Sequence, residues 1–379
     1  MNRCVMIVGI GDLGGWVLEF LARCQGVNRI VTGDIREEYA RAKTITAAVG
    51  ASQQGFNKRL EFHKVDVHDI DRTAELLASV QPDVVYSATT LMSWYVPYLF
   101  PQELAMKAKF GGVGPLVSGH LVLIYKLMQA VKKSGIKTKV LNHSFPDVVN
   151  PVLWRNGLGP DIGAGNSDLV AEDIRQKISY WHNVPPQEVA VYLYTAHPVT
   201  QQSVIREYIP HYLKIYVDGV DVTGNYDERE LIRGYASKYA PADLTSWLGH
   251  PRVAASAVKN IMAMIDDTNE LTNAPGPNGL PGGYAVRLST KGPEVVFPEG
   301  YTMEKAMQIN KEALKLDGIE EIKDDGTVVF TEESRRLHKE RLGGDIGEDL
   351  RLEDVEERAK EAVSLTKKLA EKYNIKLGF

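Results

Sequence analysis

The sequence predicts an α/β protein: a doubly wound parallel sheet in the N-terminal half, followed by an α+β substrate domain. Apolar runs typical of buried strands alternate with helical segments through the first 142 residues. A glycine-rich turn separates the first of these strands from the first helix. Beyond residue 189 the pattern changes to hairpins and one long helix. We therefore expect two domains, residues 1–150 and residues 151–379.

The glycine-rich turn follows an apolar strand at residues 5–8 and precedes a helix at residues 16–23. Its G-x-G-x-x-G pattern consists of Gly9, Gly11 and Gly14. In a Rossmann fold these glycines allow a tight turn, close approach of a pyrophosphate and close helix–strand packing. The helix N-terminus then offers free N–H groups to the phosphates. The pattern predicts a dinucleotide site, and the alternative is an ordinary glycine turn.

The second strand, residues 30–33, ends at Asp34, twenty residues beyond Gly14. A carboxylate at this distance can bind both ribose hydroxyls of adenosine. It would repel a 2′-phosphate, so we expect NAD as the cofactor, although Arg36 could reach such a phosphate and leaves this point open. The predicted cofactor-binding residues are Gly9, Gly11, Asp12, Leu13, Gly14, Asp34, Ile35, Ala88 and Thr89.

The remaining elements of the first half continue the alternation. We expect helices at 36–48, 71–80 and 120–132, strands at 60–67, 83–90 and 139–142, and a new helix after Pro146. Residues 91–115 differ, because they are apolar and aromatic and end in Gly111-Gly112-Val113-Gly114-Pro115. This segment predicts a lid over the substrate. A subunit interface and an ordinary packed helix are the alternatives.

The second half begins with a strand at 189–194 that ends shortly before His197. Asp218-Gly219 predicts a hairpin turn within 212–222. The other expected elements are a long helix at 251–271, strands at 284–288 and 294–297, a turn and strand at 323–330, and a charged surface helix at 350–374.

Composition excludes several classes of function. The net charge of −5, without a basic cluster, argues against nucleic acid and anionic membranes as partners. No apolar run approaches the ~20 residues of a spanning helix, and we expect no signal peptide. The two cysteines, Cys4 and Cys24, and the scattered histidines predict neither a disulfide framework nor a metal site. We expect a cytoplasmic protein that acts on a small molecule.

Several segments, in order, resemble the lactate and malate dehydrogenase superfamily. N-H-S-F-P-D at 142–147 is similar to its S-N-P-x-D strand end, W-R-N-G-L at 154–158 to the helix that follows, and D-I-G-A-G-N-S-D at 161–168 to its G-x-G-T-x-L-D segment. H-N-V-P-P-Q-E-V at 182–189 resembles another family segment, and its distance to His197 matches that of the family histidine. The segments 252–270 and 286–296 look like the final long helix and hairpin. The resemblance covers residues 1–310 and implies a homodimer or homotetramer.

The resemblance implies an acid–base pair of His197 and Asp168 for hydride transfer to or from a carbonyl carbon. Histidine suits this role because its reference pKa is about 6.5, and a carboxylate on the far ring nitrogen fixes its tautomer. Asn142 matches the family residue that bridges cofactor and substrate oxygen. The predicted catalytic residues are therefore His197, Asp168 and Asn142, and Asn142 is also predicted to bind the cofactor.

The chain departs from the family where the substrate carboxylate is recognised. Ala171 stands three residues beyond Asp168, where the family has an arginine, and Arg175 lies about two turns along the helix. Residues 91–100 contain no arginine either. Both carboxylate clamps are therefore missing from their expected places. We expect a secondary alcohol or ketone that is bulkier or more apolar than a small 2-hydroxy acid.

Two other functions stay open. Residues 66–70 and 81–86 resemble extended short-chain dehydrogenases and epimerases, but Tyr125 and Lys126 are adjacent rather than spaced as Y-x-x-x-K. A catalytically inactive, NAD-sensing protein would also keep the glycine turn while losing the arginines. Residues 311–379 lie beyond the resemblance.

Overall fold

The central sheet has six parallel strands in the order β3-β2-β1-β4-β5-β6. A computed structural model describes residues 3–238 and 249–378 of the chain. This order is that of a Rossmann sheet, so the predicted doubly wound fold is confirmed. The strands are β1 (Cys4–Val8), β2 (Arg29–Asp34), β3 (Arg59–Lys64), β4 (Val84–Ser87), β5 (Lys139–Asn142) and β6 (Ile162–Gly163).

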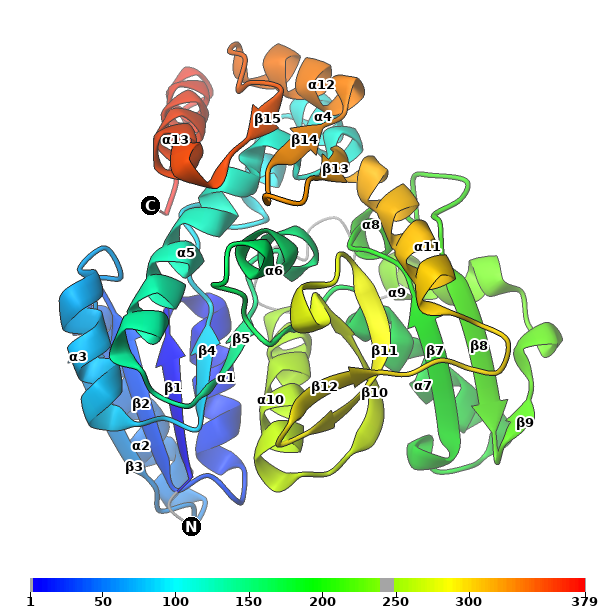
Figure 1. The fold of residues 1–379 in the computed structure, drawn as a ribbon, viewed down its shortest axis with the longest axis horizontal. Helices are drawn as coiled ribbons and strands as arrows, with labels where there is room; N and C mark the ends of the chain where they lie inside the picture. The colour runs from blue at the N-terminus through cyan, green and yellow to red at the C-terminus, as the bar shows by residue number, and fades with distance from the viewer. Residues whose placement is uncertain (1–2, 239–248, 379) are drawn as a thin grey trace.

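Helices cover both faces of this sheet (Figure 1). Alternate residues of β1 point to opposite faces: Met6 packs in one core with α3 and α5, and Ile7 packs in another with α1, α2 and α10. The last of these helices comes from the second half of the chain and ties the two halves together. The bounds are α1 (Asp12–Arg23), α2 (Glu37–Gln53), α3 (Ile70–Val80), α5 (Val117–Ser134) and α10 (His250–Asp266).

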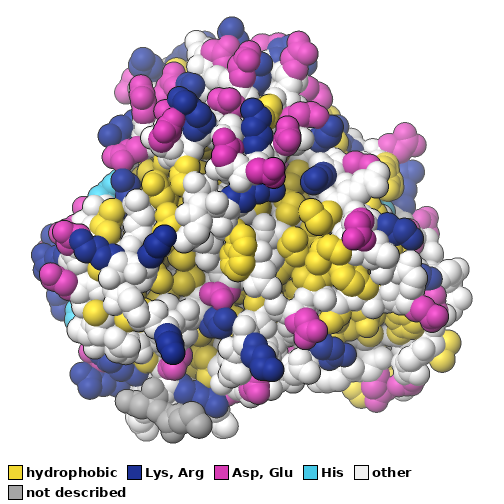
Figure 2. All heavy atoms as spheres, viewed as in Figure 1, with side chains coloured by type: hydrophobic (Ala, Val, Ile, Leu, Met, Phe, Trp, Pro, Cys, Tyr) yellow, Lys and Arg dark blue, Asp and Glu magenta, His cyan; other side chains and the backbone are white. Residues whose placement is uncertain are grey.

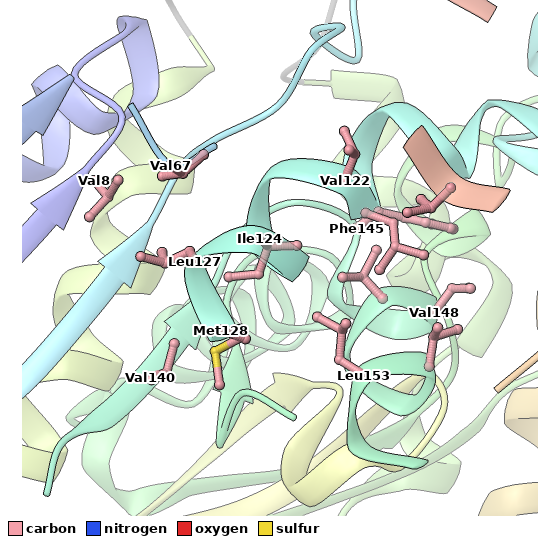
Figure 3. Close-up of a cluster of buried hydrophobic side chains, with 14 of the residues drawn as sticks. Val8, Val67, Val122, Ile124, Leu127, Met128, Val140, Phe145, Val148 and Leu153 are labelled. Carbon is pink, nitrogen blue, oxygen red and sulfur yellow. The ribbon is translucent and has the colours of Figure 1, made fainter. Parts of the chain in front are cut away.

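The helix expected after Pro146 is α6 (Pro146–Arg155), and it lies at the centre of the molecule (Figure 1). Figure 3 shows Phe145, Val148 and Leu153 beside Val122 of α5, within one buried apolar cluster. Residue 150 lies inside α6, and β6 joins the parallel sheet after it. The Rossmann unit therefore extends past the expected boundary at residue 150.

The described part of the second half contains three antiparallel three-stranded sheets, and two of them, β7-β8-β9 and β10-β11-β12, lie between residues 189 and 295 with helices around them. The expected helix at 251–271 is too long: Asp267 takes a left-handed φ of 55° and ends α10, and residues 270 and 271 belong to a strand. The elements are α7 (Ser167–His182), β7 (Val189–Tyr194), α8 (Pro198–Gln201), β8 (Tyr212–Val217), β9 (Val220–Asp221), α9 (Glu228–Lys238), β10 (Glu270–Pro275), β11 (Gly283–Ser289) and β12 (Gly292–Val295).

The C-terminal residues form a third layer over α4 and one end of α5 (Figure 1). The sequence patterns did not indicate helices α11 and α12. Helix α11 (Met303–Leu316) runs beside α8 and β7 and leads into the layer. The layer contains β13 (Ile319–Ile322), β14 (Val328–Phe330), α12 (Glu332–Leu342), β15 (Asp349–Leu350) and α13 (Val355–Lys372). In Figure 2 charged side chains crowd this layer, and apolar side chains gather across the middle of the same face below it.

Residues 91–116 pack beneath this layer. They form two short 3₁₀ turns, Val96–Leu99 and Gly114–Leu116, with α4 (Gln102–Gly111) between them. Met92 and Phe100 share an apolar core with Leu342 of α12 and Leu369 of α13. The charged surface helix expected at 350–374 is α13, and it buries one face against this core. By length and hydropathy, no single helix in residues 3–238 and 249–378 could cross a membrane.

Candidate active site

The glycine turn has the geometry that its residue types require. Gly9 follows β1 with a φ of 93°, a conformation that strongly favours glycine. A Cβ on Gly14 would lie 1.9 Å from the carbonyl oxygen of Gly9, so only glycine allows α1 to pack this closely. Glycine at these positions therefore leaves a space beside the turn that other side chains would fill.

The N-terminus of α1 faces this space. The helix begins at Asp12, so the N–H groups of its first turn, Asp12 to Gly14, have no acceptor within the helix. The Nζ of Lys43 donates to the Gly11 carbonyl oxygen at 2.9 Å and adds a positive charge beside the turn. These groups fit the pyrophosphate of a dinucleotide.

Asp34 is held tightly at the end of β2. Its carboxylate accepts the Ile10 N–H at 2.7 Å and the Arg36 N–H at 2.8 Å. The Arg36 guanidinium lies 3.3 Å from the same carboxylate, and its side chain is half exposed. Ile35, beside it, exposes 56% of its surface. The Asp34 oxygens thus accept four hydrogen bonds, two from backbone N–H groups and two from the guanidinium. A ribose diol could bind this carboxylate if it displaced the half-exposed Arg36 side chain, and an apolar side chain would lie next to it.

Ala88 and Thr89 follow β4 and lie directly beside the glycine turn. A Cβ on Gly9 would meet the Ala88 carbonyl carbon at 3.0 Å and the Thr89 nitrogen at 3.2 Å. The Thr89 hydroxyl bonds that of Ser87 at 3.0 Å. The structure therefore brings the predicted cofactor-binding residues of β1, α1, β2 and β4 together at the carboxyl edge of the sheet.

His197 lies next to this edge, at the turn between β7 and α8. Its backbone N–H donates to Oδ1 of Asp147 at 2.9 Å. Its ring Nδ1 is 2.9 Å from Oδ2 of Asp317, and the ring of Phe145 meets it edge-on at 5.3 Å between centroids. The side chain is largely buried, and no described residue bonds its Nε2. A histidine with one nitrogen held by a carboxylate and the other free is arranged for proton transfer.

Burial and charge compete at this histidine. Burial disfavours the imidazolium, but the charges of Asp317 and Asp147 outweigh it and raise the pKa of His197. Burial raises the pKa of Asp147 to about 6, against the opposing charge of His197 and a hydrogen bond from Asn166. Burial, with the nearby His197, lowers the pKa of His120 to about 4.

Asp317 was not among the predicted site residues, and it replaces Asp168 at the imidazole. Asp168 is fully buried, and its carboxylate accepts hydrogen bonds from the Lys259 ammonium and the Ser256 hydroxyl, each at 2.5 Å. The predicted pair of His197 and Asp168 is therefore not formed, because helix α10 engages the carboxylate. Asp317 ends α11, beyond the family resemblance. An amphipathic run followed by Asp317-Gly318 is a helix-stop signal that could have drawn attention to this position.

Asn142 is also placed differently from its predicted role. It is fully buried at the end of β5. Its amide nitrogen donates to the Ser144 carbonyl oxygen at 3.1 Å and to Asn150 Oδ1 at 2.9 Å, and its oxygen accepts the Ser144 N–H at 3.0 Å. These bonds occupy both amide N–H groups. We therefore assign Asn142 to shaping the turn between β5 and α6 rather than to bridging cofactor and substrate.

Two separate sets of polar contacts lie near His197. His120 of α5 bonds Thr90, after β4, at 3.3 Å and Ser144, after β5, at 3.1 Å. On the far side of His197, the Tyr98 hydroxyl donates to Gln201 of α8 at 2.9 Å. His120 and Tyr98 were not predicted. Within residues 3–238 and 249–378, no group of three His, Cys, Asp or Glu side chains could hold a metal ion.

Comparisons with known proteins agree with this architecture. No protein-family model and no curated protein matches the sequence. Among solved structures, Cryptosporidium parvum malate dehydrogenase is 15% identical with a TM-score of 0.59, and the match covers 84% of this chain and 98% of that one. The lactate dehydrogenase of the same organism, complexed with lactic acid and β-nicotinamide adenine dinucleotide, is 17% identical with a TM-score of 0.57 and coverages of 84% and 98%.

A third solved structure is Eimeria maxima lactate dehydrogenase with NADH and oxamate. It is 16% identical with a TM-score of 0.58, and the match covers 83% of this chain and 92% of that one. The chain therefore has the fold of lactate and malate dehydrogenases, and the predicted resemblance is confirmed at the level of the fold.

Proposed function

We propose that the chain is an NAD-dependent oxidoreductase that transfers a hydride between the nicotinamide and a secondary alcohol or ketone. The observation that carries this proposal is the buried His197, held at Nδ1 by Asp317 with Nε2 unbonded, beside the carboxyl edge of a Rossmann sheet. The structural neighbours crystallised with NAD or NADH support the choice of cofactor.

The chain's own residues account for cofactor binding. The first-turn N–H groups of α1 would hold the pyrophosphate, and the carboxylate of Asp34 would take the adenosine ribose hydroxyls. Ile35 offers an exposed apolar surface to the adenine. A bound nicotinamide would supply the hydride acceptor or donor. We propose NAD rather than its phosphorylated form because Asp34 lies where a 2′-phosphate would have to fit.

The acid–base step belongs to His197. In the tautomer with a proton on Nδ1, the ring donates to Asp317 and presents the Nε2 lone pair. During alcohol oxidation, Nε2 accepts the hydroxyl proton as the hydride leaves the carbon. During ketone reduction, the imidazolium returns this proton to the carbonyl oxygen. Asp317 stabilises the imidazolium in both directions, and Asp147 fixes the backbone that carries the ring.

The substrate is proposed to be bulkier or more apolar than a small 2-hydroxy acid. Ala171 stands on α7 where an arginine would be needed, and Arg175 bonds Glu172 and the Leu271 carbonyl oxygen instead. Phe145 and Tyr98 lie near the imidazole and its partner Asp317. An aromatic surrounding favours a substrate with apolar carbon next to its reacting centre.

The test is a fluorescence titration with NADH and NADPH, followed by a panel of hydroxy acids and bulky secondary alcohols. We expect tighter binding of NADH and turnover of a bulky substrate. His197→Asn should abolish turnover and leave NADH binding unchanged, whereas the exposed control His68→Asn should change neither. Efficient oxidation of lactate or malate would contradict the substrate proposal.

The alternatives are outcomes of the same test. Lys126 forms an ion pair with Glu356 of α13 at 3.1 Å rather than a contact with a site residue, so the hypothesis of a short-chain dehydrogenase gains no support. Cofactor binding without turnover of any alcohol would favour a sensor. We also propose a cytoplasmic homodimer or homotetramer, which cell fractionation and sedimentation of the purified chain would test.

A further inference from the structure

Arg36 lies across the adenosine end of the proposed cofactor site. It immediately precedes α2, and its side chain exposes 53% of its surface, whereas that of Asp34 exposes 6%. Its Nε and Nη2 lie 3.3 and 3.4 Å from the two carboxylate oxygens of Asp34. A ribose diol and this guanidinium therefore compete for the same acceptor atoms.

The guanidinium also reaches the glycine turn. A Cβ on Gly11 would lie 3.6 Å from its Nη2, so the cation contacts both the end of β2 and the turn before α1. The guanidinium carbon is 4.9 Å from the centroid of the Tyr39 ring, and the Lys43 ammonium lies 4.8 Å from the same ring. Two cations thus stand beside one buried carboxylate, although a site for an uncharged diol needs the carboxylate alone.

The two cations are held differently. Lys43 donates to the Gly11 carbonyl oxygen at 2.9 Å, and a Cβ on Gly15 would lie 2.8 Å from its Nζ, so it is fixed at the turn that fits the pyrophosphate. The Arg36 guanidinium bonds Asp34, and its Nη1 has no hydrogen-bond partner among residues 3–238 and 249–378. Because a half-exposed ion pair contributes little stability, this guanidinium can leave Asp34 at small cost.

We propose that Arg36 sets the cofactor preference by exchanging Asp34 for the 2′-phosphate of NADP. When the free diol of NAD binds Asp34, the guanidinium is displaced and makes no bond to the ribose. When the ribose carries a phosphate, Asp34 repels it, and the guanidinium supplies a compensating charge and a planar fork of N–H donors. The inference rests on the proposed function and deepens it: the protein prefers NAD but also accepts NADP, which Asp34 alone would exclude.

The test measures ligand binding to the full chain by isothermal titration calorimetry, at constant ionic strength because salt screens contacts with phosphate. The probes are ADP-ribose and its 2′-phosphate, which differ only in that phosphate. For the wild type we expect ADP-ribose to bind more tightly, by about tenfold or less. In Arg36→Met this ratio should widen to about 100-fold or more, because ADP-ribose gains a free carboxylate and the phosphorylated probe loses a charge-assisted partner.

Matched variants show whether the effect belongs to Arg36. Arg41, on the same helix, is 52% exposed, pairs with Glu37 and lies 4.9 Å from the centroid of the Phe62 ring, so Arg41→Met should leave the ratio unchanged. Lys43→Met should weaken both probes by the same factor, because the pyrophosphate is common to them. Arg36→Lys should give an intermediate ratio, since it keeps the charge without the planar fork.

A second readout separates binding from a structural role. Without ligand, Arg36→Met should melt close to the wild-type temperature, because the ion pair that it removes is half exposed. Arg36→Gln provides the same comparison should the methionine variant fail to fold. Three outcomes would overturn the inference: a ratio in Arg36→Met that stays at the wild-type value, equal weakening of both probes in that variant, or a wild type that does not bind the phosphorylated probe.

Turnover distinguishes this inference from the proposed function. Neither probe carries a nicotinamide, so the binding ratio does not depend on catalysis. A ratio that depends on Arg36, in a protein that turns over no alcohol, would support the phosphate site and overturn the dehydrogenase. Turnover that depends on His197, with a ratio independent of Arg36, would do the opposite. Failure of both probes to bind the wild type would overturn the dinucleotide site on which both proposals rest.

Discussion

At the scale of single residues, the site depends on which carboxylate reaches His197. Asp168 and Asp317 are both buried aspartates, and only their partners differ. The Asp168 carboxylate forms an ion pair with the Lys259 ammonium, which compensates its negative charge. Within residues 3–238 and 249–378, Asp317 forms an ion pair with His197 and with no lysine or arginine, so its charge acts on the imidazole. The assignment of the acid–base pair follows from this difference.

Asp317→Asn should therefore damage catalysis and change its pH dependence. Alcohol oxidation requires neutral His197, so kcat/KM should rise with pH through the raised pKa of this group. Removing the Asp317 charge lowers that pKa, which moves the acid limb to lower pH. The plateau should fall about 10²-fold or more, because the wrong tautomer is no longer excluded. The pH–rate profile measures both effects, and the exposed control Asp324→Asn should show neither.

The cofactor half of the site could be predicted from single residues, whereas the proton-transfer half could not. Glycine at positions 9, 11 and 14 and the acid at 34 lie within one contiguous unit, so local spacing places them. His197, Asp147 and Asp317 come from three distant segments. Their meeting depends on tertiary packing, and the buried contacts of Asp168 and Asn142 could not be read from sequence spacing.

At the scale of elements, the segment 91–116 and the end of α11 hold each other in place. Gly112 takes a φ of 66°, and a Cβ there would lie 2.3 Å from the Cα of Asp317. The Gly114 N–H donates to the Asp317 carbonyl oxygen at 2.8 Å. The segment was expected to be a lid, an interface or a packed helix. The structure shows it packed within the same chain, where it positions a residue of the site.

Gly112→Ala should disturb stability and the site together. The added methyl group would push the backbone of Asp317 away from His197, so both the unfolding free energy and kcat/KM should fall. Gly135→Ala is a control for loss of a glycine at positive φ: its φ is 65° with a ψ of 10°, and no atom lies within 4 Å of the added carbon. Gly112 has a ψ of −158°, so its backbone strain adds to the contact, and kinetics is the readout that reports the position of Asp317. The Gly135→Ala variant should cost only about 1 kcal/mol of conformational strain and keep full activity. Equal behaviour of the two variants in urea unfolding and kinetics would contradict the proposed contact.

Some elements could not be predicted because their patterns are ambiguous. The helix expected to 271 continued through Asp267-Thr268-Asn269, whose left-handed turn residues end it. Helix α12 is dominated by charged residues, so its apolar face was not visible. Helix α13 was recognised, but its buried face of Val355, Ala359, Ala362, Thr366, Leu369 and Ala370 is made largely of small residues. Burial of small side chains leaves a weak periodic signal.

At the scale of the whole molecule, the C-terminal layer, together with the helix α11 that leads into it, completes the pair of His197 and Asp317. It supplies Asp317, at the end of helix α11, to the imidazole. The segment 91–116 and helix α5 support it from below (Figure 1). The carboxylate that holds the imidazole therefore comes from the C-terminal residues, whereas Asp168 of α7 is bonded to α10.

The buried histidines predict that the molecule loses stability in mild acid. Burial lowers the folded-state pKa of His120 to about 4 and those of His143 and His338 to about 3. The unfolded chain, with histidine pKa values of about 6.5, binds more protons below that pH, so stability falls as pH falls. Asp147 has a raised pKa of about 6, so near pH 5 the folded protein holds a proton on this carboxyl that the unfolded chain does not. This proton offsets about one of the three that the unfolded chain gains on its histidines. Near pH 5 the net loss should be about 2.7 kcal/mol per pH unit.

Urea unfolding at pH 7, 6 and 5 measures this loss directly. A free energy of unfolding that stays constant over this range would contradict the burial of these imidazoles in neutral form. His197 does not contribute to the loss, because its raised pKa gives stability that is present below about pH 6.5 and disappears as pH rises through the folded value.

The most direct test of the central claim, that Asp317 is the partner of His197, is an NMR titration of the histidine side chains, with the His197 signal assigned from its absence in His197→Asn. We predict a pKa above 6.5 for His197 in the wild type, a lower value in Asp317→Asn and an unchanged value in Asp168→Asn. A His197 pKa that falls in Asp168→Asn and stays unchanged in Asp317→Asn would contradict the claim.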